Sequence, residues 1–196
     1  ELIQESIFEQ AKALCTNAAQ KAVVTAVRAE YHLSQGRAEL AAKYLAQCPP
    51  VFEPFADTAI RLALPKLGID DPQGYGGSWK AKASLEASNL PLITYLADKM
   101  RVGKINDDRM TCTMIGAWLT ELYLHERAER LATSTAEASS LSDPKSVQEE
   151  RMLLAQFLNS NVNSMDAKTI MKILTSHDVG AQECAHYAAK SGDIAT

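Results

Sequence analysis

The segment from Met110 to Leu124 constrains the fold most, because it is apolar on more than one helical face. A helix with a single apolar stripe lies on a surface, whereas a helix with two such faces is covered on two sides. The segment therefore predicts the inner helix of a stacked helical array. Its apolar residues are Met110, Met114, Ile115, Trp118, Leu119, Leu122 and Leu124.

Composition favours an all-α protein. Hydrophobic residues make up 46% of the 196 residues, which is enough to bury a core as one domain. Aromatic residues make up only 6%, and branched residues seldom alternate with polar ones, so no strand is predicted.

Apolar periodicity and helix-ending residues predict short helices along the chain. Asn17 is a cap, and Pro49-Pro50 ends a helix because proline cannot donate the helical hydrogen bond. Short helices joined by tight turns lie antiparallel, so the fold predicted is an α-solenoid of stacked antiparallel hairpins. The expected helices run from Ile3 to Leu14, Asn17 to Gly36, Leu40 to Cys48, Pro54 to Pro65, Leu90 to Gly103, Asn106 or Asp107 to about Thr133, Asp143 to Leu158, Ser164 to Leu174 and Gly180 to Ala188.

A pattern of alanine, any residue and tyrosine, followed by glycine, occurs twice. It spans Ala29 to Gly36 and Ala185 to Gly192. The alanine would allow close helix approach, the tyrosine would pack across the pair, and the glycine would supply a left-handed helix end. The repeat supports an array of similar hairpins.

Residues 65–89 have no helical periodicity, because glycines and an Asp-Pro pair interrupt them. We predict a flexible insertion here within a single α-solenoid segment, 1–196. Tyr75 and Trp79 are bulky aromatic residues in this stretch; they either pin it onto the array or bind a partner. The chain begins with Glu1 in a helical pattern, so we expect it to be a fragment of a longer protein.

No chemistry-bearing motif stands out. The net charge of −4 gives no long-range attraction for nucleic acid or an anionic lipid surface. The four cysteines are far apart, which signals neither a zinc site nor a disulfide framework. Glu121 and His125 share a helix face and are interpreted as structural, and Asp107-Asp108 as helix capping. We predict no enzyme activity, no catalytic residue, no metal and no cofactor.

The segment from Thr111 to Leu124 resembles the signature region of the vacuolar sorting protein eighteen family, also called the Pep3/deep orange family. Ala29 to Arg37 resembles that family's preceding hairpin, and Pro50 to Ala63 its next element. The stretch 65–89 is longer than the corresponding family connection. The residues assigned to the structural signature are Gly36, Trp118, Leu119, Glu121, Leu122 and Tyr123.

This resemblance implies a central scaffold segment of a core subunit of the HOPS and CORVET complexes, which tether membranes before fusion at endosomes and the vacuole or lysosome. It implies other HOPS and CORVET subunits as partners, with indirect membrane association through the complex. The location implied is cytoplasmic, peripheral on late endosome and vacuole or lysosome membranes, and we expect the fragment to be monomeric.

The alternative is an unrelated helical-repeat adaptor, such as a clathrin-like coat protein or a tetratricopeptide-type peptide-binding module. A protein that binds peptides in a groove is expected to repeat polar and basic residues on one inner face. The sequence has no such repetition.

Overall fold

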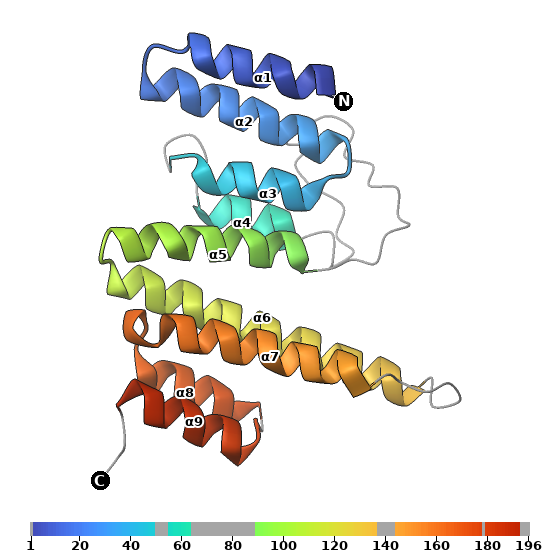
Figure 1. Cartoon of the computed structure of the whole chain (residues 1–196), viewed down its shortest axis with the longest axis vertical. Helices are drawn as coiled ribbons and strands as arrows, with labels where there is room; N and C mark the ends of the chain where they lie inside the picture. The colour runs from blue at the N-terminus through green and yellow to red at the C-terminus, as the bar shows by residue number, and fades with distance from the viewer. Residues whose placement is uncertain (1, 50–54, 64–88, 137–143, 178, 193–196) are drawn as a thin grey trace. The chain divides into compact units, whose positions relative to one another are not determined.

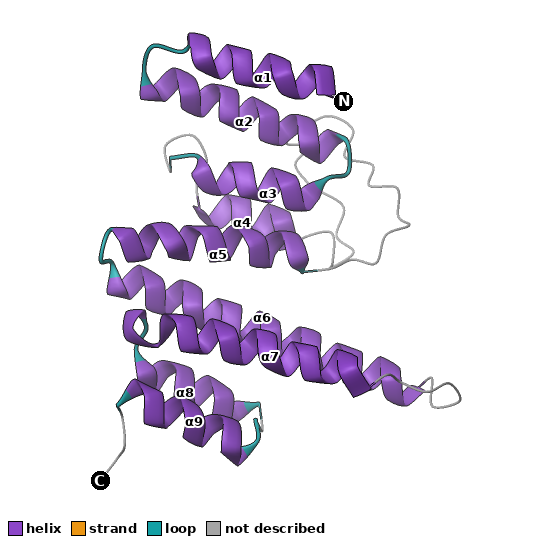
Figure 2. Ribbon diagram, in the orientation of Figure 1, coloured by secondary structure: helices purple, strands orange, loops and turns teal. Residues whose placement is uncertain are grey.

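A computed structural model describes residues 2–49, 55–63, 89–136, 144–177 and 179–192 (Figure 1). Every regular element in these ranges is helical, and no strand occurs among them (Figure 2). This confirms the predicted all-α class. Residues 65–88 of the predicted insertion and the aspartate before Pro144 lie outside the described residues. The elements are α1 (Leu2–Leu14), α2 (Ala18–Ser34), α3 (Ala38–Gln47), α4 (Phe55–Ala63), α5 (Leu90–Ile105), α6 (Arg109–Ala136), α7 (Pro144–Asn161), the 3₁₀ turn η1 (Val162–Ser164), α8 (Ala167–Ser176) and α9 (Ala181–Ser191).

The chain divides into two compact units, residues 1–99 and 100–196. In the first unit α2 packs against α1 and α3, and α4 packs against α3. The Phe55 ring stacks on the buried Tyr95 ring with centroids 5.9 Å apart. Lys99 of α5 donates to the Cys48 carbonyl (3.1 Å), which satisfies a helix-terminal acceptor at the end of α3. The buried apolar side chains of this unit include Leu33, Leu45, Leu62, Leu92, Tyr95 and Leu96.

In the second unit α6 packs against α7 and α8, and α9 packs against α8 and α7. Lys104 of α5 donates to the Ser160 carbonyl (3.1 Å) and so satisfies an acceptor at the end of α7. The core lies between these helices, and its buried apolar side chains are Met100, Cys112, Ile115, Leu119, Leu124, Leu154, Leu158, Met165, Ile170, Leu174 and Tyr187.

Local capping chemistry explains where several helices begin. The Asn17 side chain accepts from the Gln20 backbone N–H (2.8 Å), as predicted, and the Gln20 side chain accepts from the Thr16 backbone N–H (2.9 Å). The prediction that Ser164 opens a helix is wrong. Asp166 caps α8 by accepting from the Thr169 backbone N–H (2.9 Å), and Ser164 ends the 3₁₀ turn.

The turn between α5 and α6 also differs from the prediction. Gly103 does not close α5, which continues to Ile105, since a single helical glycine costs only about 1 kcal/mol relative to alanine. Of the capping candidates Asn106, Asp107 and Asp108, it is Asp108 that caps α6. Hydrogen bonds from the hydroxyl and backbone N–H of Thr111 hold the pKa of the Asp108 carboxyl below its ordinary value.

The repeated glycines have the predicted backbone conformation. Gly36 has φ 74° and Gly192 has φ 70°, both in the left-handed region that ends a helix. The alanine part of the repeat holds only once, because Ala29 is fully buried whereas Ala185 is exposed. The glycines therefore keep the repeat at both places, and the buried alanine occurs in α2 alone.

Replacing Gly36 should cost stability through its backbone alone, since no other atom lies within 4 Å of an added Cβ. We expect Gly36→Val to destabilise the protein by about 1–2 kcal/mol, because a Cβ is strained at positive φ. Gly36→Asn should cost less, since asparagine tolerates this conformation. Urea unfolding of both variants checks this order; equal stability of Gly36→Val and wild type would contradict the turn argument.

Candidate functional site

The signature residues of α6 lie along one helix but have different surroundings. Leu119 is fully buried, and the Tyr123 ring packs on the Phe157 ring of α7 with centroids 5.4 Å apart. Glu121 forms an ion pair with His177 at the end of α8. Trp118 and Leu122 are half-buried. The signature residues therefore contact two neighbouring helices, α7 and α8. Leu119 is the one fully buried side chain among them.

The predicted coverage of α6 on two sides is only partly correct. Ile115, Leu119 and Leu124 are buried, but Met110 is 85% exposed and Met114 is 51% exposed. An apolar face makes burial favourable, but burial also requires a neighbouring helix that packs on that face. The first turns of α6 expose their methionine face in this structure.

Gly116 is a key residue of α6 that the sequence analysis missed. A Cβ added there would lie 2.3 Å from the Met165 sulfur and 3.4 Å from the Met100 methyl carbon. Met165 is 1% exposed, so its side chain has little room to move. Gly116 thus allows the segment before α8 to approach α6 closely. The available signal was a glycine inside a strongly apolar helix, which usually has a packing reason.

Two polar contacts also attach α6 to α8 and α9. The Thr113 hydroxyl accepts from the Asp166 backbone N–H (2.9 Å) where α8 begins. Further along, Arg127 forms an ion pair with Glu183 of α9 (3.1 Å). We call the residues of α6 that make these contacts the α6 spine, and they are Thr113, Gly116, Leu119, Glu121, Tyr123 and Arg127.

The α6 spine joins α7, α8 and α9 to one helix of the second unit. His125 does not pair with Glu121 but with Glu129, one turn further along α6 (3.2 Å). Since Glu121 instead reaches His177, the acidic residue of the signature is part of the packing between α6 and α8. The contacts of the α6 spine have a structural role, because they fix the positions of the helices.

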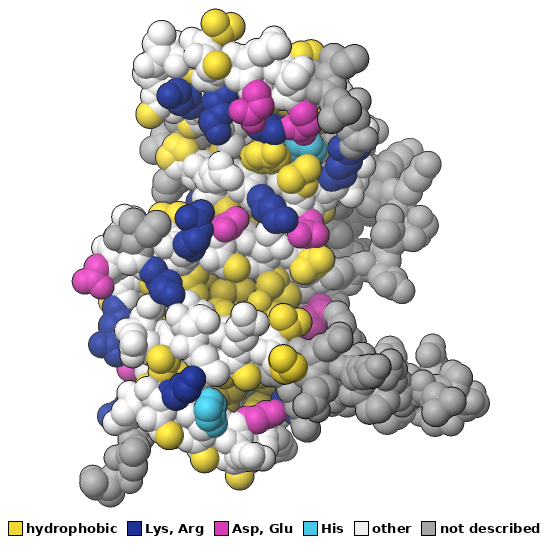
Figure 3. Space-filling view, viewed as in Figure 1, with side chains coloured by type: hydrophobic (Ala, Val, Ile, Leu, Met, Phe, Trp, Pro, Cys, Tyr) yellow, Lys and Arg dark blue, Asp and Glu magenta, His cyan; other side chains and the backbone are white. Residues whose placement is uncertain are grey.

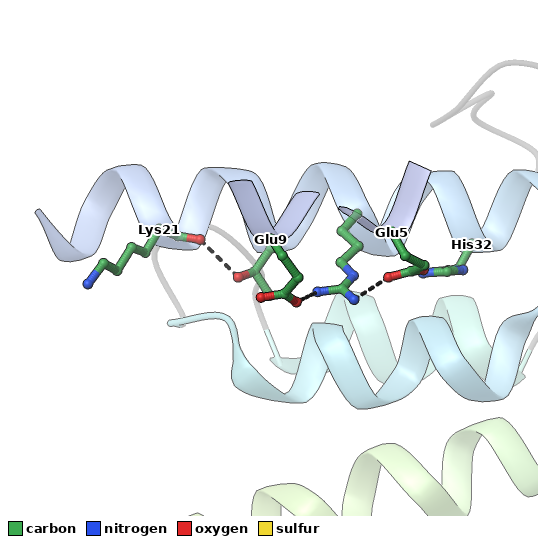
Figure 4. Close-up of polar contacts among 6 residues, drawn as sticks. Glu5, Glu9, Lys21 and His32 are labelled. Carbon is green, nitrogen blue, oxygen red and sulfur yellow. Dashed lines mark hydrogen bonds and ion pairs between the residues drawn. The ribbon is translucent and has the colours of Figure 1, made fainter. Parts of the chain in front are cut away.

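A second cluster lies between α1, α2 and α3, and we call it the Arg28 cluster: Glu5, Glu9, Arg28, His32 and Tyr44. Figure 4 labels its members Glu5, Glu9 and His32. The Arg28 guanidinium forms ion pairs with Glu5 and Glu9 of α1. It also lies 4.3 Å from the centre of the Tyr44 ring of α3, a cation–π contact. Burial opposes the charge, but the hydrogen bonds to Glu9 and Glu5 outweigh it, so the pKa of Arg28 is raised.

A small apolar hollow of about 250 Å³ opens between α7, α8 and α9. Leu154, Leu158, Leu174, Val179 and Tyr187 contribute apolar surface to its lining. The size suits one or two apolar side chains and is below the usual range of small-molecule sites.

The described residues contain neither a cluster of metal ligands nor a membrane-spanning helix. No group of three or more histidine, cysteine or acidic side chains in these ranges is arranged to hold a metal ion. None of the described helices combines the length and the apolar character needed to cross a bilayer. Burial raises the pKa values of the Cys112 and Cys184 thiols, which disfavours the reactive thiolate. On the face drawn in Figure 3, basic and acidic side chains are interspersed over the described residues.

The remaining predicted residues fall in two groups. Gly36 lies in the turn between α2 and α3, away from the α6 signature in sequence, and serves as a turn residue. Tyr75 and Trp79 lie outside the described residues, and their binding of a partner stays a prediction.

Comparison with known proteins gives one family match. The chain matches the family model described as VPS18, alpha-solenoid domain, first half, over residues 2–193. No curated protein and no solved structure gives a match. The family match covers nearly the whole chain and confirms the resemblance drawn from Thr111 to Leu124, and it favours that family over an unrelated helical-repeat adaptor. The chain therefore belongs to the VPS18 family, and its fold is that of the family's α-solenoid domain.

Proposed function

We propose that this chain is an architectural scaffold segment of a subunit shared by the HOPS and CORVET tethering complexes, acting in transport and fusion from the endosome to the vacuole or lysosome. The observation that carries the proposal is the match over residues 2–193 to the VPS18 α-solenoid domain. The segment is not an enzyme in this proposal. Its work is to link and orient the parts of the subunit on either side of it.

The contacts of the α6 spine support such a mechanical role. A helix that is bonded to its neighbours at separate points along its length resists sliding better than one held by apolar contacts alone, because hydrogen bonds and ion pairs are directional. In the second unit, Thr113, Glu121 and Arg127 fix successive points along α6 to the start of α8, the end of α8 and α9. In a helical stack, each hairpin contacts mainly its neighbours, so local fixing of this kind keeps the whole array in shape.

The proposed partners are the other HOPS and CORVET subunits. We propose that the protein is a cytoplasmic protein, peripheral on late endosome and vacuole or lysosome membranes, and that it reaches the membrane through the complex. Residues 65–89, with Tyr75 and Trp79, are the proposed docking segment, since aromatic residues are enriched among the side chains that dominate binding energy. The isolated chain is proposed to be monomeric.

A binding experiment with purified subunits tests the docking part of this proposal. The immobilised chain is mixed with each remaining HOPS and CORVET subunit, and the amount retained is measured. We expect at least one subunit to bind the wild-type chain, and the double variant Tyr75→Ala, Trp79→Ala to lose most of that binding, because alanine truncation of a binding hot spot costs about 2 kcal/mol or more.

The matched control is Ser78→Ala with Lys80→Ala, which changes the same stretch but keeps both aromatic rings. Circular dichroism of each variant verifies that the helices are intact. Retention of no subunit by the wild-type chain would refute docking through this segment. Equal retention by the aromatic and control variants would refute the role of Tyr75 and Trp79.

A further inference from the structure

Helix α1 is attached to the first unit without a buried apolar anchor among its described side chains. None of the side chains from Gln4 to Leu14 is fully buried, and Ile7 and Leu14 are 52% and 82% exposed. The main apolar contact is the Phe8 ring, which lies 5.7 Å from the Tyr31 ring of α2. An element with so little apolar burial opens more readily than the core it rests on.

Charge neutralisation supplies the missing attachment. Arg28 belongs to α2 and is only 9% exposed, yet the carboxylates that neutralise it, Glu5 and Glu9, both come from α1. Figure 4 shows the labelled Glu5 and Glu9 side chains reaching from α1 into the space beside α2. The Arg28 side chain is only 11% exposed, so leaving its charge without a countercharge in the closed form is unfavourable, although Glu9 itself lies largely in solvent. Arg28 therefore attaches α1 to α2 through these two side chains.

His32 is the titratable group behind this ion pair. Its ring is fully buried and stacks on the Tyr44 ring with centroids 5.3 Å apart. Its Nε2 atom lies 2.9 Å from Oε1 of Glu5, but the two groups are poorly aligned, since neither ring nitrogen makes a hydrogen bond within the described part of the chain. The ring is thus buried with both polar atoms unsatisfied, which is costly.

The charged groups that face His32 come from all three helices and the turn between them. Glu5 of α1 favours a positive charge on the ring, whereas Arg28 of α2 and Arg37 at the start of α3 oppose it. Tyr44 of α3 stacks on the ring. Burial is the largest influence, and the pKa of His32 is lowered from its ordinary value of 6.5.

We propose that Glu5, Glu9, Arg28 and His32 form an acid-released latch, in which proton uptake detaches α1 from α2 while the rest of the first unit stays folded. Detachment opens His32 to water, where the ring takes up a proton more readily than in the closed form. The latch is fully closed at a pH above the ordinary pKa of histidine and opens as the pH falls below it. Substituting Glu5 and Glu9 by neutral residues should act in the same direction, because it removes the countercharge of Arg28.

Hydrogen–deuterium exchange followed by mass spectrometry tests the latch. Exchange is measured at about pH 7.5 and about pH 5.5 and corrected for the intrinsic pH dependence of amide exchange. We expect protection of residues 2–14 to fall by up to about tenfold between these pH values, because pH 5.5 lies about one unit below the ordinary pKa of histidine. Protection of α3 and α8 should stay unchanged over the same range.

Three variants separate the parts of the latch. The double variant Glu5→Gln, Glu9→Gln should open α1 at about pH 7.5, and His32→Gln should remove the pH dependence between about pH 7.5 and 5.5. Glu39→Gln is the matched control, because Glu39 forms an exposed ion pair with Lys43 on α3 and should change nothing. Equal protection of α1 at both pH values would overturn the proposal, and so would loss of protection in α1 and α3 together. A pH dependence retained in His32→Gln would exclude His32 as the sensor.

Discussion

The variant Gly116→Val should destabilise the unit formed by residues 100–196 by about 1–3 kcal/mol, the usual cost of forcing extra methyl groups into a packed core. The side chain would meet the buried Met165 sulfur at a distance that no Cβ tolerates. Valine is a better test than alanine, because alanine would regain about 1 kcal/mol of helix propensity and hide part of the clash.

Urea unfolding measures this effect, and a double-mutant cycle assigns its cause. In the presence of Met165→Ala, the penalty of Gly116→Val should shrink, because the smaller side chain makes room for the new methyl groups. The control is Ala128→Val, an exposed position of the same helix. A penalty that is the same with and without Met165→Ala would mean that the close approach of α6 and Met165 is not the cause.

The variant Leu119→Ala should cost about 2–5 kcal/mol, because it removes a fully buried side chain from the core between α6 and its neighbours and leaves a cavity. Trp118→Ala should cost less, although its side chain is larger, since Trp118 is only half-buried. Urea unfolding of both variants gives the order. A larger loss for Trp118→Ala than for Leu119→Ala would contradict the burial described for α6.

Features that depend on neighbouring residues in the chain were predictable from the sequence. The Asn17 cap and the left-handed glycines Gly36 and Gly192 follow from local backbone rules, and the structure has all three. Where several capping candidates lie within a few residues, the sequence did not predict which of them caps the helix. Asp108 is the cap of α6 among the candidates Asn106, Asp107 and Asp108. Asp166 caps α8 where the pattern favoured Ser164, and its backbone N–H donates to Thr113 of α6, a contact between residues far apart in the chain.

Features that depend on residues far apart in the chain were not predictable. The importance of Gly116 rests on Met165, and the burial of Arg28 rests on carboxylates of a different helix. Periodicity likewise marked Met110 and Met114 as apolar without saying that they are exposed. The proposed role of Tyr75 and Trp79 depends on the surface of a partner, which the sequence of one chain does not contain.

The most direct test of the scaffold role is a swap in the full-length subunit. Residues 2–193 are replaced by an unrelated helical solenoid of equal length, and a second version carries only the Gly116→Val change. Both are expressed in cells that lack the natural protein, and content mixing between late endosomes and vacuoles or lysosomes is measured beside recovery of the proposed HOPS and CORVET partners. If the segment both spaces the subunit and docks partners, the swap should lower subunit recovery and content mixing together. Full recovery and full content mixing with the unrelated solenoid would contradict a docking role and leave the segment a spacer of fixed length.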